Sequence, residues 1–205
     1  LNCASGGTGI GVDAAFSEGV EVRNGRISAM GGSGLSLGWR STVDGLRAES
    51  NLGSGVVVKD GSRIRNTQSF RNGAAGISVA DSSTVERSTV WSNGTIGIEA
   101  QGFATIVENS VSSNLGGGIV VGNGALLRAN NVASNSGTGI VTSLGALIES
   151  NVLYANGIGA PAGPGINAGT GSLIRANSVR GSGGFGISIG QSGYADNVIF
   201  DNQGG

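Results

Sequence analysis

Two aspartates at equivalent places of a repeated pattern are the residues of this sequence best suited to acid–base chemistry. Asp60 stands in the segment KDGS and Asp81 in ADSS, with Lys59 and Glu99 close by in the repeat described below. If the two positions are equivalent on neighbouring parallel strands, their Cα atoms lie about 4.8 Å apart. The carboxyl groups could then approach the roughly 5 to 5.5 Å of a retaining glycosidase, or share a Ca²⁺ ion.

The same two segments also have an ordinary structural interpretation. KDGS and ADSS are typical of tight turns in which an Asp side chain bonds its own backbone, and Asn123 takes the same place in another repeat. We therefore favour a turn role for Asp60 and Asp81, and we keep them as the candidate catalytic residues.

A second pair with the same spacing indicates carbohydrate binding. Phe70 and Trp91 are one repeat apart, and polar and charged residues stand beside them in the pattern, namely Arg47, Glu49, Gln68 and Thr89. Sugar rings lie on aromatic faces, while amide, hydroxyl and charged groups bond the sugar hydroxyls. We predict these six residues as the ligand-binding site; the alternative is that the rings only cover neighbouring strands or pack under a loop.

The residue types that are missing narrow the chemistry. The chain has no histidine, one lysine, Lys59, and one cysteine, Cys3. This composition removes the usual general-base, Schiff-base and metal-ligand routes, and we expect no cofactor and no metal. A lone cysteine forms no disulfide within the chain, which leaves the redox compartment open.

The spacing of both pairs is the period of most of the sequence. A glycine followed by an aliphatic residue begins each repeat, and the interval between these glycines is constant except for one longer step, from Gly139 to Gly165. Self-similarity at a fixed period of about 21 residues indicates a solenoid. The leading glycines are Gly34, Gly55, Gly76, Gly97, Gly118, Gly139, Gly165 and Gly186.

Each repeat holds three short runs of strand-forming residues, punctuated by Gly, Asn and Ser and without a helical period. In the repeat beginning at Gly118 we expect strands at 119–121, 125–127 and 131–133. Stacking the repeats gives one continuous apolar column per strand, and each buried side chain contributes roughly 1.5 to 3 kcal/mol. The columns are Leu35, Val56, Ile77, Ile98, Ile119, Ile140, Ile166 and Ile187; Val43, Ile64, Val85, Ile106, Leu127, Ile148 and Ile174; and Val90, Val111, Val132, Leu153 and Val179.

Two further columns consist of asparagine. Asparagine tolerates the left-handed conformation of tight turns, and its amide can bond to the coils on either side. We therefore assign these residues to the turns rather than to a catalytic or metal site. The third-turn column is Asn51, Asn72, Asn93, Asn114, Asn135 and Asn156, and the second-turn column is Asn109, Asn130, Asn151 and Asn177.

The repeats resemble those of right-handed parallel β-helix proteins, in the asparagine columns and in first strands such as GISV at Gly76 and GIVV at Gly118. The resemblance covers residues 34–202 and implies an all-β, single-stranded, right-handed parallel β-helix of about eight to nine coils with three strands per coil. Parallel crossovers favour the same hand. The family includes lyases, glycoside hydrolases, epimerases, tailspikes and adhesins, so the resemblance does not fix a function. The clustered Asp and His motifs of its pectin hydrolases and alginate epimerases do not occur here.

We expect one elongated domain over residues 1–205. Residues 9–33 read as a longer, degenerate first coil, and residues 34–202 as the regular coils. Five additional residues, at about 157–164, predict a loop at the third turn. Insertions in repeat proteins often decorate the functional side, although a short Pro/Gly insertion is more often neutral.

One outward column predicts association. Leu126, Leu147 and Leu173 follow one another on the second strands, Tyr194 lies close to the continuation, and threonines occupy the column earlier. Exposed apolar patches of this extent usually meet a partner. We expect these four residues to contact another subunit or a flanking segment.

Charge and composition limit the partners. The net charge is −1 and only 12% of residues are charged, which gives no basic patch for nucleic acid. The sequence has no apolar run of the ~20 residues that a membrane helix needs. Because chains of this architecture are usually exported and Leu1 begins within the pattern, we expect an extracellular or cell-surface location.

We predict a non-catalytic β-helix module that serves as a scaffold or as a polysaccharide-binding or adhesion surface. The alternatives are a polysaccharide-active enzyme, of the lyase, glycoside hydrolase or epimerase class, with an atypical carboxylate site, and a fibre-forming subunit.

Overall fold

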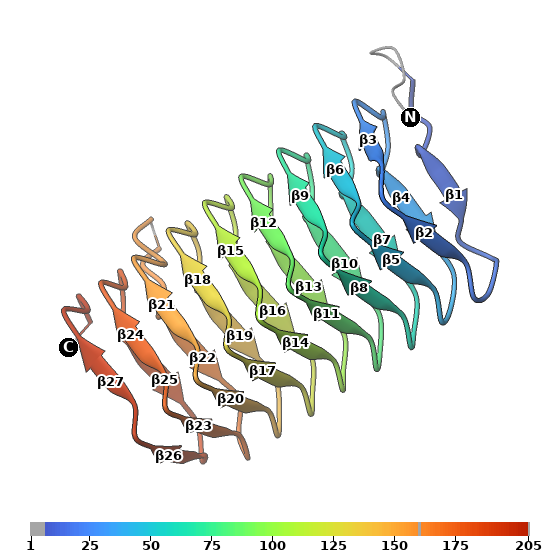
Figure 1. Cartoon of the computed structure of the whole chain (residues 1–205). Helices are drawn as coiled ribbons and strands as arrows, with labels where there is room; N and C mark the ends of the chain where they lie inside the picture. The colour runs from blue at the N-terminus through green and yellow to red at the C-terminus, as the bar shows by residue number, and fades with distance from the viewer. Residues whose placement is uncertain (1–6, 160, 205) are drawn as a thin grey trace.

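The computed structural model describes residues 7–159 and 161–204 and folds them into a solenoid of three-residue β-strands. Cys3 lies outside the described residues. The strands form three sheets of nine strands each, and every coil contributes one strand to each sheet. Figure 1 shows the coils stacked along one axis between the two termini.

We number the sheets by the order of their strands within a coil. Sheet 1 contains β1 (Val12–Ala14), β4 (Leu35–Leu37), β7 (Val56–Val58), β10 (Ile77–Val79), β13 (Ile98–Ala100), β16 (Ile119–Val121), β19 (Ile140–Thr142), β22 (Ile166–Ala168) and β25 (Ile187–Ile189). Sheet 2 contains β2 (Glu21–Arg23), β5 (Thr42–Asp44), β8 (Arg63–Arg65), β11 (Thr84–Glu86), β14 (Thr105–Val107), β17 (Leu126–Arg128), β20 (Leu147–Glu149), β23 (Leu173–Arg175) and β26 (Gly193–Ala195). Sheet 3 contains β3 (Arg26–Ser28), β6 (Arg47–Glu49), β9 (Gln68–Phe70), β12 (Thr89–Trp91), β15 (Ser110–Ser112), β18 (Asn131–Ala133), β21 (Val152–Tyr154), β24 (Ser178–Arg180) and β27 (Val198–Phe200).

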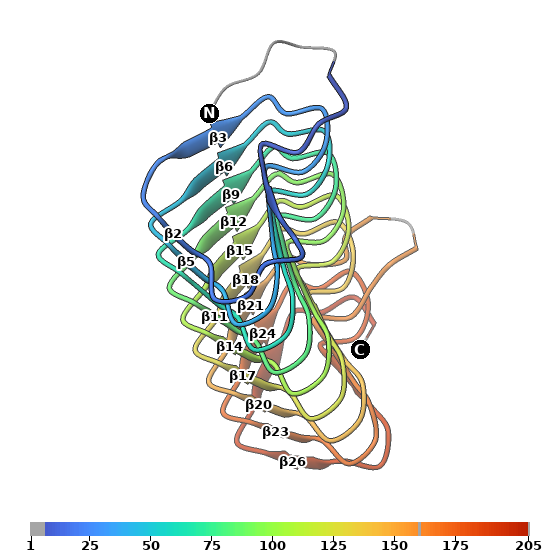
Figure 2. The same cartoon turned by 90° about the vertical axis from the view of Figure 1, so that its right-hand side faces the viewer.

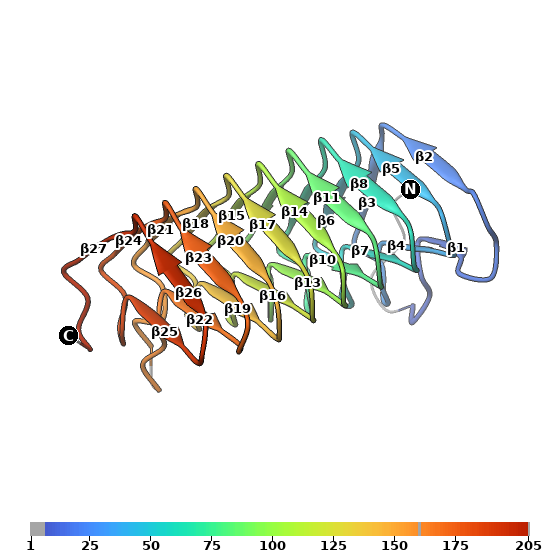
Figure 3. The same ribbon diagram turned by 90° about the horizontal axis from the view of Figure 1, so that it is seen from below.

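Neighbouring strands are parallel and pair in the register that the sequence period predicts. Ile98 pairs with Ile119 and Ile119 with Ile140, so each column of the repeat runs along the axis. The coils nest over one another when the molecule is viewed closer to its axis (Figure 2), and the strands of sheet 2 lie side by side in Figure 3. The all-β parallel solenoid predicted from the sequence is therefore confirmed.

The core consists of aliphatic ladders. Ile98, Ile119 and Ile140 are fully buried, as are Ile106 and Val111 from the other two columns of the same region. In sheet 1 the first and third residues of a strand face inward, whereas in sheets 2 and 3 only the central residue does. Sheets 2 and 3 consequently present two outward columns each, and sheet 1 presents one.

The leading glycines are required because the backbone passes close to the third strand and the next coil. A Cβ atom on Gly97 would lie 2.4 Å from Cγ1 of Val111 and 2.7 Å from the carbonyl oxygen of Gly118. Real Cβ atoms do not approach other atoms so closely, so any larger residue would displace the coil. This crowding explains why glycine recurs at the start of each repeat.

The asparagine columns form the predicted ladders in the turns. Asn93, Asn114 and Asn135 are buried, and each amide bonds the corresponding residue of the next coil. The left-handed conformation, however, belongs to the residue before each ladder asparagine, for example Ser92 and Ser113 in the third turn. The ladder asparagines therefore serve as hydrogen-bonding groups, and the conformational part of the prediction was wrong.

One local boundary differs from the prediction. The second strand of the coil at Gly118 is Leu126–Arg128, one residue later than expected, because Ala125 is a buried turn residue. The insertion after Gly157 forms a loop that extends beyond the turns of the neighbouring coils (Figure 2).

Candidate functional site

The outer face of sheet 3 brings the predicted ligand-binding residues together. Its strands point their first and third residues outward, which creates two neighbouring columns. Arg47 pairs with Gln68 and Gln68 with Thr89 in one column, and Glu49, Phe70 and Trp91 pair in the same way in the other. All six residues predicted from the sequence therefore lie on adjacent strands of one face.

The two rings stack on each other. The centroids of Phe70 and Trp91 are 4.0 Å apart and their planes differ by 9°. Stacking follows from the register, since paired strands place the two side chains about 4.8 Å apart and roughly parallel. Phe70 is only 4% exposed, whereas Trp91 is half-buried. Trp91 is therefore the ring of this pair that is available to a ligand.

A charged cluster holds the other side of Phe70. Glu49 is 5% exposed and accepts a hydrogen bond of 3.0 Å from Arg47, and Arg26 forms a second ion pair with it. Burial raises the pKa of Glu49, but the hydrogen bonds from Arg47 and Arg26 outweigh it, so the pKa lies below its ordinary value of 4.5. The guanidinium of Arg47 also lies 4.9 Å from the centroid of Phe70. Arg47 thus joins the carboxylate to the aromatic stack, as a cation–π contact allows.

Exposed polar side chains border the rings. Gln68 and Thr89 are exposed and occupy the column next to Phe70 and Trp91. An amide and a hydroxyl at this position can bond the rim of a sugar whose face lies on the indole. That these residues bind a ligand stays a prediction.

The aspartate pair lies on the turn between sheets 1 and 2. The N–H of Gly61 donates to the carbonyl of Asp81, which places Asp60 and Asp81 on adjacent coils as expected. Oδ1 of Asp81 accepts a hydrogen bond of 2.8 Å from the N–H of Gly102 in the next coil, and Asn123 bonds Leu144 in the same way. These side chains stabilise the turn of the following coil rather than their own.

Asp60 differs from Asp81. Its carboxylate makes no hydrogen bond or ion pair within residues 7–159 and 161–204. It lines a cavity of about 340 Å³ together with Glu18, Trp39, Arg40, Gly61 and Ser82. Asp60 is therefore the member of the pair that is free to act on a ligand.

A contact of Lys59 with two aromatic rings beside this cavity was not predicted from the sequence. The ammonium group of Lys59 lies 3.9 Å from the ring centroid of Trp39 and 4.7 Å from that of Phe16. Lys59 occupies the position of the repeat that Gly38 occupies in the preceding coil, and not the position of Trp39. Equivalent positions of the repeat therefore give no sign of this contact.

Sheet 3 carries a second aromatic cluster near its C-terminal end. Tyr154 pairs with Arg180 and Arg180 with Phe200, on β21, β24 and β27. The guanidinium of Arg180 lies 4.8 Å from the ring of Tyr154 and 5.3 Å from that of Phe200. The cluster was not predicted from the sequence, because the loop insertion and the short last coil interrupt the regular period between these three residues.

The leucine column lies on sheet 2 as predicted, except at its end. Leu126 pairs with Leu147 and Leu147 with Leu173, which is 39% exposed. Tyr194 does not continue the column, because it pairs with Ile174 and the position beside Leu173 belongs to Gly193. The last coil is one residue short, and this shifts Tyr194 into the inward column. Tyr194 is nevertheless 49% exposed next to Gly193, so its place in the interface stays a prediction.

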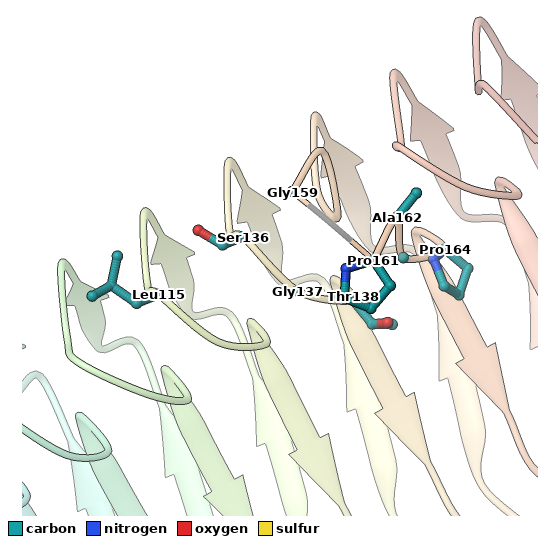
Figure 4. Close-up of a pocket in the computed structure, with 9 residues that line it drawn as sticks. Leu115, Ser136, Gly137, Thr138, Gly159, Pro161, Ala162 and Pro164 are labelled. Carbon is teal, nitrogen blue, oxygen red and sulfur yellow. The ribbon is translucent and has the colours of Figure 1, made fainter.

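The loop insertion borders a cavity of about 400 Å³. Figure 4 shows Pro161, Ala162 and Pro164 on the loop side, and Ser136, Gly137 and Thr138 on the neighbouring coil, with Leu115 one coil further away. No charged side chain is among the described residues around this cavity. The cavity therefore offers backbone groups and small side chains but no acid, base or cation from that part of the chain.

The described part of the chain holds neither a cluster of metal ligands nor a membrane helix. No group of three or more His, Cys, Asp or Glu side chains within it could hold a metal ion. Nor does any helix there have the length and apolarity to cross a bilayer.

The comparisons agree with the fold. Residues 2–103 match the family model of the right-handed β-helix region. The A-modules of the mannuronan C-5 epimerases AlgE6 and AlgE4 from Azotobacter vinelandii superpose with TM-scores of 0.67 and 0.61 at 14% and 15% identity. The matches cover 90% and 91% of this chain but only 57% of each module. No curated protein sequence matches the chain.

The chain therefore belongs to the right-handed parallel β-helix proteins. The similarity to the two epimerase modules concerns the fold, and this chain spans little more than half of their length.

Proposed function

We propose that the chain is an extracellular β-helix module that binds polysaccharide on the outer face of sheet 3 and does not itself catalyse a reaction. The observation that carries this proposal is the stack of Phe70 and Trp91, with Trp91 accessible and Gln68 and Thr89 exposed beside it. Two proteins that share the fold are named for epimerisation of mannuronan, a polysaccharide, and a carbohydrate ligand is in keeping with those names.

The outer face of sheet 3 is rigid, so a ligand can bind there with little loss of conformational entropy of the side chains. Phe70 fixes one side of the indole, and Arg47 together with Glu49 fixes Phe70. A ring that is already held in place loses little conformational freedom when a ligand stacks on it. The face is thus organised before the ligand arrives.

The test is retention on immobilised or gel-embedded polysaccharides. We expect the wild-type chain to be retarded by at least one polymer of a neutral and acidic panel, and Trp91→Ala to abolish that retardation while the circular dichroism spectrum is unchanged. Phe103→Ala is the matched control, because Phe103 is an exposed aromatic residue, at 68%, on the turn between sheets 1 and 2. Equal retention of the Trp91 variant and the wild type would contradict the proposal.

A second candidate function rests on Asp60. A carboxylate without a partner in the described part of the chain, beside a cavity of about 340 Å³ that also holds Trp39 and Arg40, is suited to a polysaccharide-active enzyme. Reducing-sugar and unsaturated-product assays on the same polymers test it. Product release that disappears in Asp60→Asn and persists in Trp91→Ala would replace the binding module with an enzyme.

A further inference from the structure

The cluster of Tyr154, Arg180 and Phe200 places a cation between two aromatic rings on an open surface. Arg180 is exposed, and the two rings are 47% and 40% exposed. The three side chains occupy the same outward column of sheet 3 that contains Phe70 and Trp91 nearer the N-terminus. The column therefore carries an aromatic cluster at each end.

Arg180 differs from most arginines of the chain because it has no acidic partner in the described residues. Of the eleven arginines, eight form ion pairs, and Arg71, Arg128 and Arg180 form none within residues 7–159 and 161–204. Two of these three, Arg71 and Arg180, lie at aromatic rings of sheet 3, with Arg71 6.0 Å from the centroid of Phe70. A guanidinium offers five N–H donors in a planar fork, a geometry that fits a carboxylate or sulfate. Arg180 thus retains its capacity to bind an anion.

The net charge of the strands also favours sheet 3 as the face that binds an anion. The strands of sheet 3 contain three arginines and one glutamate, a net charge of +2, whereas those of sheet 1 contain one aspartate and one glutamate, a net charge of −2. The whole chain carries −1. This difference in charge favours sheet 3 over sheet 1 as the face for a polyanion.

Small side chains separate the two clusters. Between Trp91 and Tyr154 the column contains only Ser112 and Ala133, and the adjacent column there contains Ser110 and Asn131. Trp91 and Tyr154 are three strand steps apart, which corresponds to about 14 Å at the spacing of a β-sheet. A linear polymer that lies along the column meets no bulky side chain between the two clusters.

We propose that Tyr154, Arg180 and Phe200 form a second subsite, which binds an acidic sugar residue of the polysaccharide that also contacts Trp91. The guanidinium of Arg180 pairs with a carboxylate or sulfate of the sugar, and the ring of Tyr154 or Phe200 carries its apolar face. This inference rests on the proposed function and specifies its ligand class as a polyanionic polysaccharide that spans both clusters.

The experiment compares the full-length chain on three polymers, namely polygalacturonate, dextran sulfate and neutral dextran, by affinity electrophoresis at about 0.15 M salt. Retardation by the first or the second polymer distinguishes a carboxylate from a sulfate ligand. We expect Arg180→Gln to weaken binding to the acidic polymer by roughly tenfold to a hundredfold, the usual effect of losing a hydrogen-bonded charge. Arg128→Gln is the matched control, because Arg128 is also exposed and unpaired in the described part of the chain but lies on sheet 2. It should bind like the wild type.

Several outcomes separate this inference from the proposed function. Equal weakening by Arg180→Gln and Arg128→Gln would indicate unspecific charge attraction and overturn the subsite. Retention on neutral dextran alone, lost in Trp91→Ala, would keep the binding function and reject the acidic ligand. Weakening by Arg180→Gln with no effect of Trp91→Ala would keep the subsite and reject a polymer that spans both clusters.

A second copy of the chain is the other conceivable occupant, because Val152 and Val198 beside the cluster are 51% and 58% exposed. Light scattering of the wild type and of Val152→Glu tests it. A dimer that dissociates in this variant, together with absence of polymer binding, would overturn the proposal.

Discussion

The side-chain amide of Asn114 donates to Oδ1 of Asn135 at 2.9 Å, and the Oδ1 of Asn114 in turn accepts from the amide of Asn93 at 3.0 Å. The same Oδ1 also accepts the backbone N–H of Asn93. Asn114 therefore satisfies two buried donors of the preceding coil while it bonds the following one. The ladder links the coils through the interior of the third turn.

Replacing Asn114 by Ala should lower the free energy of unfolding by about 1 to 3 kcal/mol, since two buried donors of Asn93 lose their acceptor. Urea unfolding followed by circular dichroism measures the change. Ser113→Ala is the control, because Ser113 is exposed and precedes Asn114 directly. An Asn114 variant as stable as the control would show that the ladder follows from the fold without stabilising it.

The leading glycine makes an independent prediction about packing. Gly97→Ala should destabilise the chain by about 1 to 3 kcal/mol or more, because its Cβ would overlap Val111 and the carbonyl of Gly118. Gly102→Ala should be nearly neutral, since its Cβ would meet its nearest neighbour at 3.4 Å, an ordinary contact. Thermal unfolding of the two variants measures this difference in stability. Equal melting temperatures would refute the steric explanation.

The period of the sequence was sufficient to predict the register, because a column that is apolar in every coil can only face inward. Ile119 and Ile148 are fully buried for this reason. The pattern could not predict which residue takes the left-handed conformation, because serine, arginine and alanine all occupy that place, as at Ser50, Arg71 and Ala155. Backbone geometry, and not residue type, fixes that position.

The candidate site was predictable only where the period was regular. Phe70 and Trp91 are one regular repeat apart and were found as a column. Tyr154, Arg180 and Phe200 form an equivalent column, but the insertion and the short last coil change their spacing. The contact of Lys59 with Trp39 was missed for a different reason, because the long flexible side chain reaches across to a turn residue outside its own column.

Glu49 predicts a dependence of stability on pH. Its pKa in the folded state lies below the ordinary value of 4.5, so its contribution is fully present above pH 4.5 and is lost as the pH falls through the folded-state pKa. At pH 7, Glu49→Gln should therefore be less stable than the wild type by about 1 to 2 kcal/mol, a value reduced for the exposure of both arginines. The difference should shrink in acid.

Urea unfolding of both proteins at pH 7, 5 and 3 measures this difference. Glu108→Gln serves as the control, because Glu108 is exposed and forms no ion pair in the described part of the chain. A difference between wild type and Glu49→Gln that stays constant with pH would assign the loss to packing around Phe70 instead of to charge.

The leucine column predicts self-association through sheet 2. Leu126, Leu147 and Leu173 form a continuous outward apolar stripe, and Thr84 and Thr105 occupy the same column in earlier coils. We expect size-exclusion chromatography with light scattering to give a mass above the 20.1 kDa of the monomer, and Leu147→Glu to restore the monomer mass. Leu147→Thr should act in the same direction and is suited to the strand, since threonine already occurs in this column. Leu144→Glu is the control, because Leu144 is 57% exposed but lies on the preceding turn. If the wild type is monomeric at high concentration and neither Leu147 variant changes its solubility, the stripe is simply exposed and the interface does not exist.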